Sequence, residues 1–420
     1  MTPVTAASPP SSASATGRPG AHSPVALPTV TMVGGGQLAR MTHQAAIALG
    51  QRLRVLAQHP DDPAAQVSPD VVLGSHTDLD ALRTAAVGAG ALTFDHEHVP
   101  TEHLEVLVAE GVNVAPPPHA LVLAQDKLAM RLRLAELGVP VPRFAAVRTA
   151  AEVRAFGAPL VLKMIRGGYD GRGVWSADDL DTALTVAEPL FAAGTTLLAE
   201  AKVPFRRELA AVVARSPYGQ GAAWPVVESV QRAGQCAVVI APAPGLTEEL
   251  ATAAEELALR LAAELGVVGV LAVELFEVAP DPDAPGGLLV NELAMRPHNS
   301  GHWGMDGAVT GQFEQHLRAV LDYPLGDTTP LAPVTVMANI LGAPQAPAMS
   351  LDERLHHLFA RMPEAKVHLY GKAERPSRKI GHVNVLGDDV ADVRERAERA
   401  AHWMAHARWL DGWDGGNGHG

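Results

Sequence analysis

The order of hydrophobic and polar positions near the start of the chain predicts strands that alternate with helices. Residues 29–33 are β-branched or apolar and end in three glycines, and the next segment repeats apolar side chains at helical spacing until Gly50. Short apolar runs follow at residues 53–57, 71–73 and 91–94. Strands that alternate with helices are typical of a parallel sheet covered by helices. This part of the chain is therefore predicted to be a parallel α/β domain.

Further elements are predicted in the middle of the chain. Asp126 and Gly138 have the residue types of an N-cap and a C-terminal glycine around a helical segment. Lys127 lies in the first turn of that helix, where the dipole disfavours a cation, and this placement points to an anionic partner. An apolar run at residues 158–162 predicts a strand that delivers Lys163, and residues 247–265 predict a long helix.

A hairpin is predicted from residues 270–278 and 288–294, because the segment between them is rich in Pro, Asp and Gly. If the hairpin closes symmetrically, Glu274 lies opposite Glu292, with both side chains on the same face. Asn291 then points to the other face unless the strand is twisted or bulged. Two facing carboxylates repel, and Mg²⁺ bound by them together with phosphates relieves the repulsion. The alternative is a pair of half-exposed glutamates on a sheet.

Proline-containing segments at residues 116–118 and 324–333 mark two domain boundaries. The predicted organisation is a disordered tail (1–27), an N-terminal α/β domain (28–118), a middle domain (119–325) with a glycine-rich lobe at about 139–200, a small C-terminal domain (326–411) and a second tail (412–420).

Composition narrows the function. The chain has 420 residues, with 33 Lys+Arg against 46 Asp+Glu and a net charge of −13. This balance argues against nucleic-acid and anionic-membrane partners. Cys236 is the single cysteine, which excludes a disulfide framework and a zinc site built from cysteines, so we expect a cytoplasmic protein. The tail at the start lacks the pattern of a signal peptide. No apolar run approaches the ~20 residues that span a bilayer.

The glycine-rich segment after Lys163 predicts a phosphate-binding loop. Gly167, Gly168, Gly171 and Gly173 let backbone N–H groups approach a polyphosphate, and the preceding lysine adds a positive charge. The alternative is a β-hairpin whose tight turn requires glycine. The segment is not a Walker loop, because no Gly-Lys-Ser/Thr opens a helix there.

A second glycine cluster, residues 34–36, precedes the first helix. Its Gly-x-Gly-x-x-Ala spacing matches a dinucleotide fingerprint, so a nicotinamide oxidoreductase is one alternative function. That fingerprint requires an acidic residue at the end of the second strand, where this chain has Gln58 and His59. The start of a helix built on glycines remains a good anion site.

Three polar clusters suggest a substrate pocket. Residues 95–98 are Asp-His-Glu-His, and we expect Glu97 to contact substrate, with a solvated loop as the alternative. Residues 296–303 place an arginine and two histidines directly after the predicted Glu292 strand. Residues 372–379 contain four basic side chains in an acidic protein, which indicates a phosphate site unless they are only solvated surface.

Gly-Gly-Tyr-Asp-Gly-Arg-Gly at residues 167–173 resembles the glycine-rich loop of ATP-grasp enzymes. Together with Arg-Pro-His-Asn-Ser-Gly-His-Trp at 296–303 and the Tyr-Gly-Lys and Arg-Lys-Ile-Gly-His-Val-Asn segments at 370–384, it resembles the 5-(carboxyamino)imidazole ribonucleotide synthetase family. The resemblance covers about residues 29–411. It implies an α/β and α+β architecture, namely an ATP-grasp fold with an N-terminal parallel α/β (pre-ATP-grasp) domain and a small C-terminal domain.

The resemblance also implies the reaction and its ligands. The expected activity is ATP-dependent carboxylation of 5-aminoimidazole ribonucleotide with bicarbonate through carboxyphosphate, in de novo purine biosynthesis. ATP and Mg²⁺ are the expected ligands, with Mn²⁺ as an alternative metal. The expected partners are these small molecules and a second copy of the chain in a homodimer.

The residues implied for each role fall into four groups. The catalytic residues are Lys163, Arg296 and His298. The ATP-binding residues are Lys127, Lys163, Gly168, Tyr169, Asp170, Gly171, Arg172, Gly173, Glu200, Ala201, Lys202, Val203, Glu208, Gln231, Asn291 and Glu292. The substrate-binding residues are Gly36, Gln37, Leu38, Glu97, Tyr169, Arg296, His298, Asn299, Ser300, Lys372, Arg378 and Lys379. The metal ligands are Glu274 and Glu292.

One segment departs from the family pattern. Ser229 and Gln231 stand where the family has Asn and His. Glutamine keeps the hydrogen-bonding capacity of histidine but carries no proton near neutral pH. A non-catalytic nucleotide-binding relative is therefore an alternative, as is an ATP-grasp ligase that uses another acid such as formate.

Overall fold

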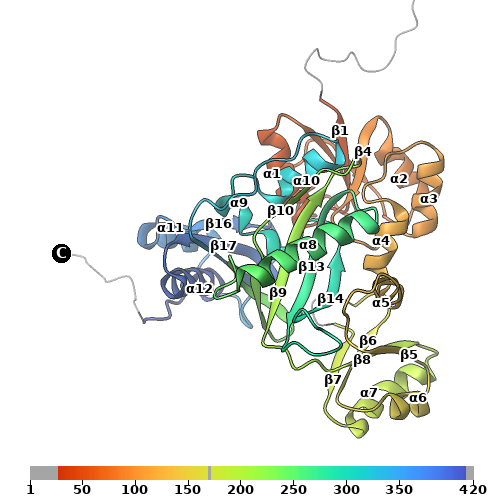
Figure 1. The fold of residues 1–420 in the computed structure, drawn as a ribbon. Coiled ribbons are helices and arrows are strands. Elements are labelled where there is room, and N and C mark those ends of the chain that lie inside the picture. The colour runs from red at the N-terminus through yellow and green to blue at the C-terminus, as the bar shows by residue number, and fades with distance from the viewer. Residues whose placement is uncertain (1–26, 169–171, 413–420) are drawn as a thin grey trace, which may run out of the picture.

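The structure, a computed structural model, describes residues 27–168 and 172–412 (Figure 1). The tails expected at residues 1–27 and 412–420 lie almost wholly outside this part.

The N-terminal region is a parallel sheet in the order β3-β2-β1-β4, seen at the top of Figure 1. Apolar side chains fill both faces, so one face packs against α1 and α10 while the other packs against α2 and α3. This confirms the predicted parallel α/β arrangement. The elements are β1 (Thr29–Val33), α1 (Gln37–Ala48), β2 (Arg52–Ala57), β3 (Val71–Leu73), α2 (Leu79–Ala86), β4 (Ala89–Phe94), α3 (Thr101–Ala109), α4 (Pro118–Gln125) and α5 (Lys127–Glu136).

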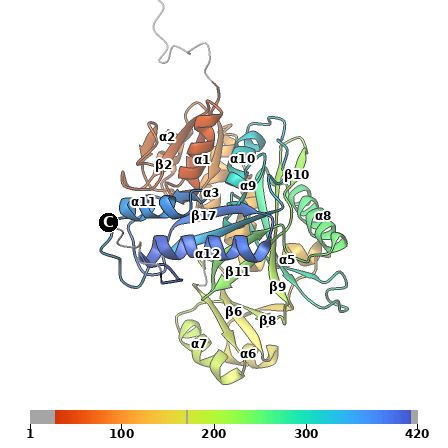
Figure 2. The ribbon, with the colours of Figure 1, turned by 90° about the vertical axis from the view of Figure 1, so that its left-hand side faces the viewer.

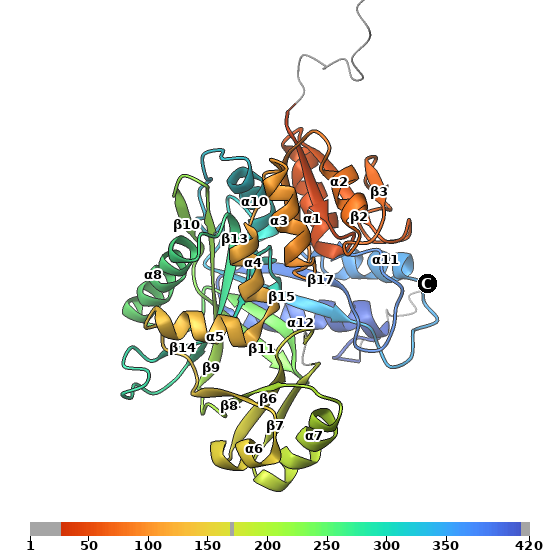
Figure 3. The same ribbon diagram turned by 90° about the vertical axis from the view of Figure 1, so that its right-hand side faces the viewer.

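A second, antiparallel sheet in the order β5-β8-β6-β7 forms a separate lobe, which we call the lid lobe. It projects at the bottom of Figures 1 and 3, with α6 and α7 on its outer face. Its elements are β5 (Phe144–Val147), α6 (Ala150–Phe156), β6 (Leu160–Met164), β7 (Val174–Ala177), α7 (Leu180–Ala192) and β8 (Leu197–Ala201). The strands β6 and β7 pair as antiparallel neighbours, which does not conflict with a phosphate-binding role for the segment between them.

The largest sheet runs in the order β14-β13-β9-β11-β12-β15-β17-β16, with β10 paired to β9. Helix α8 covers β9 and β13 in Figure 1, and α12 packs on β15 and β17 in Figure 2. The strands are β9 (Arg207–Arg215), β10 (Gly221–Ala223), β11 (Val227–Arg232), β12 (Gln235–Ala241), β13 (Gly269–Glu277), β14 (Leu288–Ala294), β15 (Val334–Leu341), β16 (Lys366–Leu369) and β17 (Lys379–Gly387). The helices are α8 (Glu248–Glu264), η1 (Asn299–Gly301), α9 (Gly304–Gly307), α10 (Gln312–Val320), α11 (Leu351–Arg361) and α12 (Val390–His406).

This sheet crosses the predicted boundary at residue 326, since β15, β17 and β16 continue the order that begins at β14. The C-terminal segment therefore shares backbone hydrogen bonds with the middle of the chain. The predicted domain limits remain predictions.

The β13–β14 hairpin has the predicted register at its key position. Glu274 pairs with Glu292, after which the register shifts so that Leu275 pairs with Val290. The shift is a bulge at Asn291, which turns this side chain toward the face of the glutamates. The bulge that the sequence analysis required for Asn291 is therefore present.

No helix in the described part of the chain combines the length and the hydrophobicity needed to span a lipid bilayer.

Candidate active site

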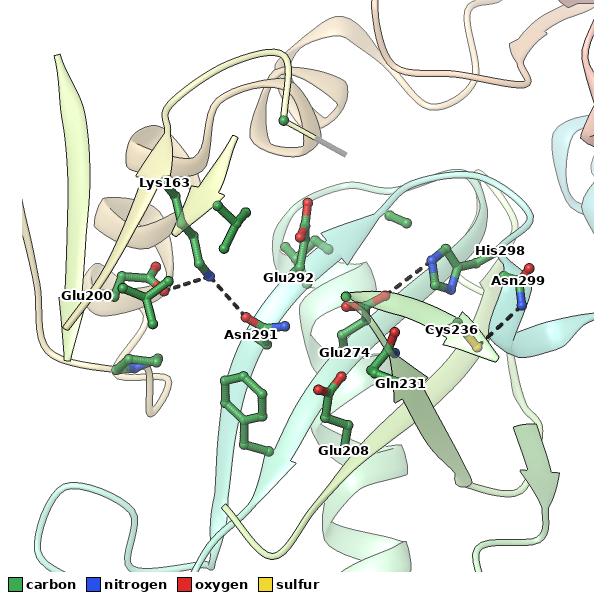
Figure 4. Close-up of a pocket in the computed structure, with 18 of the residues that line it drawn as sticks. Lys163, Glu200, Glu208, Gln231, Cys236, Glu274, Asn291, Glu292, His298 and Asn299 are labelled. Carbon is green, nitrogen blue, oxygen red and sulfur yellow. Dashed lines mark hydrogen bonds and ion pairs between the residues drawn. The ribbon is translucent and has the colours of Figure 1, made fainter. Parts of the chain in front are cut away.

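A cavity of about 650 Å³ lies where the lid lobe, the β13–β14 hairpin and the loop after β4 meet. Figure 4 shows Lys163 and Glu200 of the lid lobe on one side and Glu274, Asn291 and Glu292 of the hairpin on the other. Segments that are far apart in sequence meet at this cavity, and the spacing of their motifs along the chain does not reveal this. The predicted site residues that line it are Glu97, Lys163, Gly168, Glu200, Ala201, Lys202, Val203, Glu208, Gln231, Glu274, Asn291, Glu292, Arg296, His298, Asn299 and Lys379.

Lys163 of β6 is held by a buried network of charges. Its Nζ lies 2.7 Å from Glu200 Oε2 and donates to Asn291 Oδ1 at 3.2 Å. Arg131 of α5 is fully buried, and it donates at 2.6 Å both to the other Glu200 oxygen and to the Asn291 carbonyl. Burial lowers the pKa of Lys163, although the charge of Glu200 acts in the opposite direction. These contacts fix the ammonium group at the lid-lobe end of the cavity.

Glu274 and Glu292 face one another across the hairpin. Burial and then the charges of Glu292 and Glu208 raise the pKa of Glu274 to about 8. Lys127, in the first turn of α5, forms an ion pair with Glu292. A buried carboxylate that is this costly to ionise and that faces a second carboxylate has the chemistry of a cation site, and hard oxygen ligands suit Mg²⁺. In the described part of the chain no group of three or more His, Cys, Asp or Glu is placed to hold a metal ion.

Arg296 and His298 lie at the other end of the cavity. Arg296 Nε donates to Glu97 Oε2 at 2.8 Å. Burial by itself would raise the pKa of Glu97. The charge of Arg296 and its hydrogen bond outweigh burial and lower the pKa of Glu97 to about 2. His298 Nε2 lies 3.2 Å from Glu274 Oε1, while its Nδ1 lies 2.9 Å from Ser300 Oγ. The ion pair and the imidazole therefore stand next to the carboxylate pair.

The start of α1 lies beside this end of the site and meets the C-terminal segment. The backbone N–H of Gly36 donates to Asp95, whose pKa burial raises to about 6. Lys372 donates from Nζ to Gln37 Oε1 at 2.5 Å, although the two residues are 335 positions apart. A helix N-terminus and a lysine side chain are thus brought together, which is the chemistry of an anion site.

Gln231 occupies the cavity wall between two acids. Its Nε2 donates to Ser229 Oγ at 3.0 Å, and Figure 4 shows it beside Glu208 and Glu274. Burial raises the pKa of Glu208, and the hydrogen bond from Gln231 acts in the opposite direction. The residue that departs from the family pattern is therefore part of the site.

Three family models match successive parts of the chain. These are the ribonucleotide synthetase preATP-grasp domain over residues 27–125, the ATP-grasp domain over residues 132–313, and the phosphoribosylaminoimidazole carboxylase C-terminal domain over residues 335–396. The chain is 68% identical over 391 residues to the N5-carboxyaminoimidazole ribonucleotide synthase of Mycobacterium tuberculosis (strain ATCC 25618 / H37Rv), covering 92% of this chain and 90% of that one. It is 52% identical to the synthase of Corynebacterium ammoniagenes, covering 94% and 96%.

The chain belongs to the N5-carboxyaminoimidazole ribonucleotide synthase family.

Solved structures agree with this membership. The N5-carboxyaminoimidazole ribonucleotide synthetase of Thermus thermophilus matches with a TM-score of 0.78 and 36% identity, covering 92% of this chain and 100% of that one. The Aspergillus clavatus enzyme in complex with ADP and 5-aminoimidazole ribonucleotide matches with a TM-score of 0.79 and 30% identity, covering 90% and 98%. The predicted ATP-grasp fold is confirmed, and the alternative of a nicotinamide oxidoreductase is wrong.

Not every residue predicted for this synthase-family site lines the cavity. Tyr169, Asp170 and Gly171 lie outside the described residues. Ser300 is buried against His298. The remaining predicted residues do not line the cavity: Gly36, Gln37, Leu38, Lys127, Arg172, Gly173, Lys372 and Arg378.

The side chains of two of these residues make contacts within the protein. Leu38 is buried with Met41 and Phe313 in a core cluster, so its side chain is not available to a ligand. Arg378 donates to the carbonyl of Ala373 in its own loop at 3.2 Å.

Glu200 is only 2% exposed, and it pairs with Lys163 and Arg131. Its partner Arg131 was missed, although it lies one helical turn after Lys127 and therefore on the same face of α5. Phe276 also lines the cavity and stacks on Phe205 with 4.7 Å between ring centroids. Its position two residues after Glu274, on the same strand face, was the signal that could have identified it.

Proposed function

We propose that this chain carboxylates 5-aminoimidazole ribonucleotide with bicarbonate and ATP, giving N5-carboxyaminoimidazole ribonucleotide, ADP and phosphate. The observation that carries the proposal is a single cavity lined by a lysine suited to bind phosphate, by a pair of carboxylates and by an arginine–histidine pair. In addition, the chain is 68% identical to a protein named for this product. The Aspergillus clavatus relative binds ADP and 5-aminoimidazole ribonucleotide.

ATP is assigned to the lid-lobe end of the cavity. Lys163 and Lys127 are suited to hold its phosphates, because each ammonium group is already placed by a carboxylate partner. The backbone N–H and C=O groups of residues 201–203 are suited to hydrogen-bond adenine. The Lys202 side chain is not needed for this contact, because it pairs with Asp178 at 2.6 Å. The Glu208 carboxylate is placed to accept a hydrogen bond from a ribose hydroxyl.

Glu274 and Glu292 are assigned to Mg²⁺, for which Mn²⁺ is an alternative. When bound, the metal supplies charge neutralisation on the transferring phosphoryl group. Until then Lys127 offsets part of the negative charge beside Glu292.

The ribonucleotide is assigned to the other end. The N-terminus of α1 at Gly36 and Gln37, together with Lys372, Arg378 and Lys379, would hold the 5′-phosphate. With the phosphate anchored there, the imidazole ring lies toward Arg296, next to the bicarbonate.

The chemistry requires placement and charge stabilisation more than a nucleophilic side chain. A bicarbonate oxygen attacks the γ-phosphorus of ATP, and ADP leaves as the new P–O bond forms carboxyphosphate. The exocyclic amine then attacks the carboxyl carbon, phosphate leaves, and the amine loses a proton. Arg296, oriented by Glu97, stabilises the anionic carboxyl oxygens, and His298 orients them beside Glu274.

The deciding experiment measures ADP release by the purified protein with each substrate omitted in turn. We expect release only when both bicarbonate and aminoimidazole ribonucleotide are present. Release with formate in place of bicarbonate would favour the alternative ligase, and no release under any condition would favour a binding relative.

A homodimer in the cytoplasm is part of the same proposal. Light scattering coupled to size-exclusion chromatography tests the dimer, and a single species at 44.0 kDa contradicts it.

A further inference from the structure

Gln312, the first residue of α10, forms hydrogen bonds to the backbone of the loop that carries His298. Its Oε1 accepts from the His298 N–H at 2.8 Å, and its Nε2 donates to the His298 carbonyl at 2.7 Å. The same Nε2 lies 2.8 Å from His302 Nδ1. Gln312 is 1% exposed, so all of these bonds are shielded from water. One amide thus holds both ends of a five-residue loop.

The orientation of this amide follows from its partners. Only the oxygen can accept from an N–H and only the nitrogen can donate to a carbonyl, so Oε1 and Nε2 cannot be exchanged. Since Nε2 is a donor, His302 Nδ1 must accept. His302 is then neutral with its proton on Nε2, and burial lowers the pKa of His302 well below its usual value in agreement.

The packing around the loop leaves little freedom for another arrangement. A side chain at Gly301 would collide with the Gln312 amide. The carbonyl of His302 accepts from Asn384 at 3.1 Å. The charged and titratable groups around His302 are Arg296 and His298 on its own segment, His368 on β16, and Tyr370, Lys379 and His382 on or beside β17.

We propose that Gln312 is a positioning residue of the reaction, which sets the backbone of residues 298–302 and so aims His298 and Asn299 into the substrate end of the cavity. His298 reaches Glu274, and Asn299 Nδ2 lies 3.5 Å from Cys236 Sγ, so both side chains depend on this backbone. The inference rests on the proposed function of the His298 loop in binding the ribonucleotide.

The chain contains a matched control on the same helix. Gln315 is also buried and makes the same pair of backbone bonds, from Nε2 to the Gly326 carbonyl at 2.8 Å and from the Gly326 N–H to Oε1 at 2.7 Å. Gly326 does not line the cavity. Gln312→Leu and Gln315→Leu therefore each remove one pair of backbone bonds, and only the pair of Gln312 holds the site; Gln312→Leu also removes the bond to His302 Nδ1.

The kinetic arm compares these two variants. A loop displaced by ~1 Å lowers the rate on the order of 10²-fold. Gln312→Leu should therefore raise KM for aminoimidazole ribonucleotide and lower kcat, so that kcat/KM for this substrate falls at least about tenfold. KM for ATP should stay within about twofold of the wild-type value. Gln315→Leu should lower Tm by a similar amount, while KM for aminoimidazole ribonucleotide and KM for ATP both stay unchanged. Equal KM values in the two variants would overturn the proposal.

The spectroscopic arm starts from wild-type protein, whose result tests the amide geometry without any variant at position 312. In wild-type protein with ¹⁵N-labelled histidine, and with His302 assigned by His302→Asn, we expect an unprotonated Nδ1 and a protonated Nε2. In Gln312→Glu the carboxylate accepts from Nδ1 instead, so the proton should move to Nδ1, whereas Gln315→Glu should leave the His302 signal unchanged. A protonated Nδ1 in wild type would overturn the assignment.

The two proposals fail in different ways. If wild type releases no ADP with both substrates present, the proposed function fails while the His302 signal still tests the amide geometry. If wild type is active, His298→Ala is impaired and Gln312→Leu behaves as Gln315→Leu, only the positioning role is wrong.

Discussion

Replacing Arg131 by methionine should damage both stability and ATP binding, for reasons that can be separated. Arg131 is fully buried, and its Nε lies 2.6 Å from Glu200, which is itself 2% exposed. Removing one member of a buried ion pair costs about 3–5 kcal/mol, and Glu200 here loses one of its two cationic partners, with Lys163 remaining. For a chain of 420 residues this corresponds to a decrease in Tm of about 3–6 °C.

The loss of ATP binding follows from Lys163. Its Nζ contacts Glu200 at 2.7 Å and Asn291 at 3.2 Å, and Arg131 holds both of these residues. With Arg131 removed, the lysine loses its fixed position, and a weakened charge-assisted hydrogen bond of ~1.5–3 kcal/mol raises KM for ATP roughly ten- to hundredfold.

The conditions of this measurement follow from the ionisation of Glu200. Burial raises the pKa of Glu200, but Arg131 and Lys163 outweigh it and lower the pKa below the ordinary 4.5. The ion pairs therefore stabilise the fold fully above that pH, and the contribution is lost as pH falls below it. Tm and KM should be measured near pH 7, where the whole effect is present.

A matched control separates stability from function. Arg354 is a buried arginine of the C-terminal segment, and it donates to Glu374 at 2.6 Å. Arg354→Met should lower Tm by a similar amount with KM for ATP unchanged. In Arg131→Met/Glu200→Gln the buried Lys163 ammonium also loses its carboxylate partner, so ATP binding should stay weak. The reasoning is refuted if Arg131→Met leaves KM for ATP unchanged, or if Arg354→Met raises it equally.

Three further changes test the assigned roles. Glu274→Gln and Glu292→Gln should each abolish turnover and weaken Mg²⁺-dependent ADP binding measured by calorimetry, whereas unchanged metal dependence in both would exclude this carboxylate pair as the metal site. Lys372→Met and Lys379→Met should raise KM for aminoimidazole ribonucleotide roughly ten- to hundredfold without changing KM for ATP, and equal increases in both would mean that the lysines are structural. Gln231→His should change kcat less than tenfold, under ~1.4 kcal/mol of transition-state free energy, while an inert wild type rescued by this change would show that histidine is required.

Local patterns determined much of this protein. The four strands of the N-terminal sheet and helix α8 were predictable from apolar periodicity and from punctuating glycines, because strands and helices depend mainly on neighbouring residues. The pairing of Glu274 with Glu292 was predictable for the same reason, since a hairpin joins strands close in sequence. The family and its reaction followed from short motifs whose residue types carry the chemistry.

Tertiary structure alone decided which distant residues meet. Arg131 and Glu200 are 69 positions apart, and Lys372 and Gln37 are 335 apart, so no periodicity connects them. Whether a glutamate is an exposed acid or the buried holder of a lysine depends on what packs over it, which a local pattern does not contain. Likewise Gln312 looks like any polar residue at the start of a helix. It becomes a candidate positioning residue because the fold buries its amide against the His298 backbone, where the amide oxygen can only accept and the amide nitrogen can only donate.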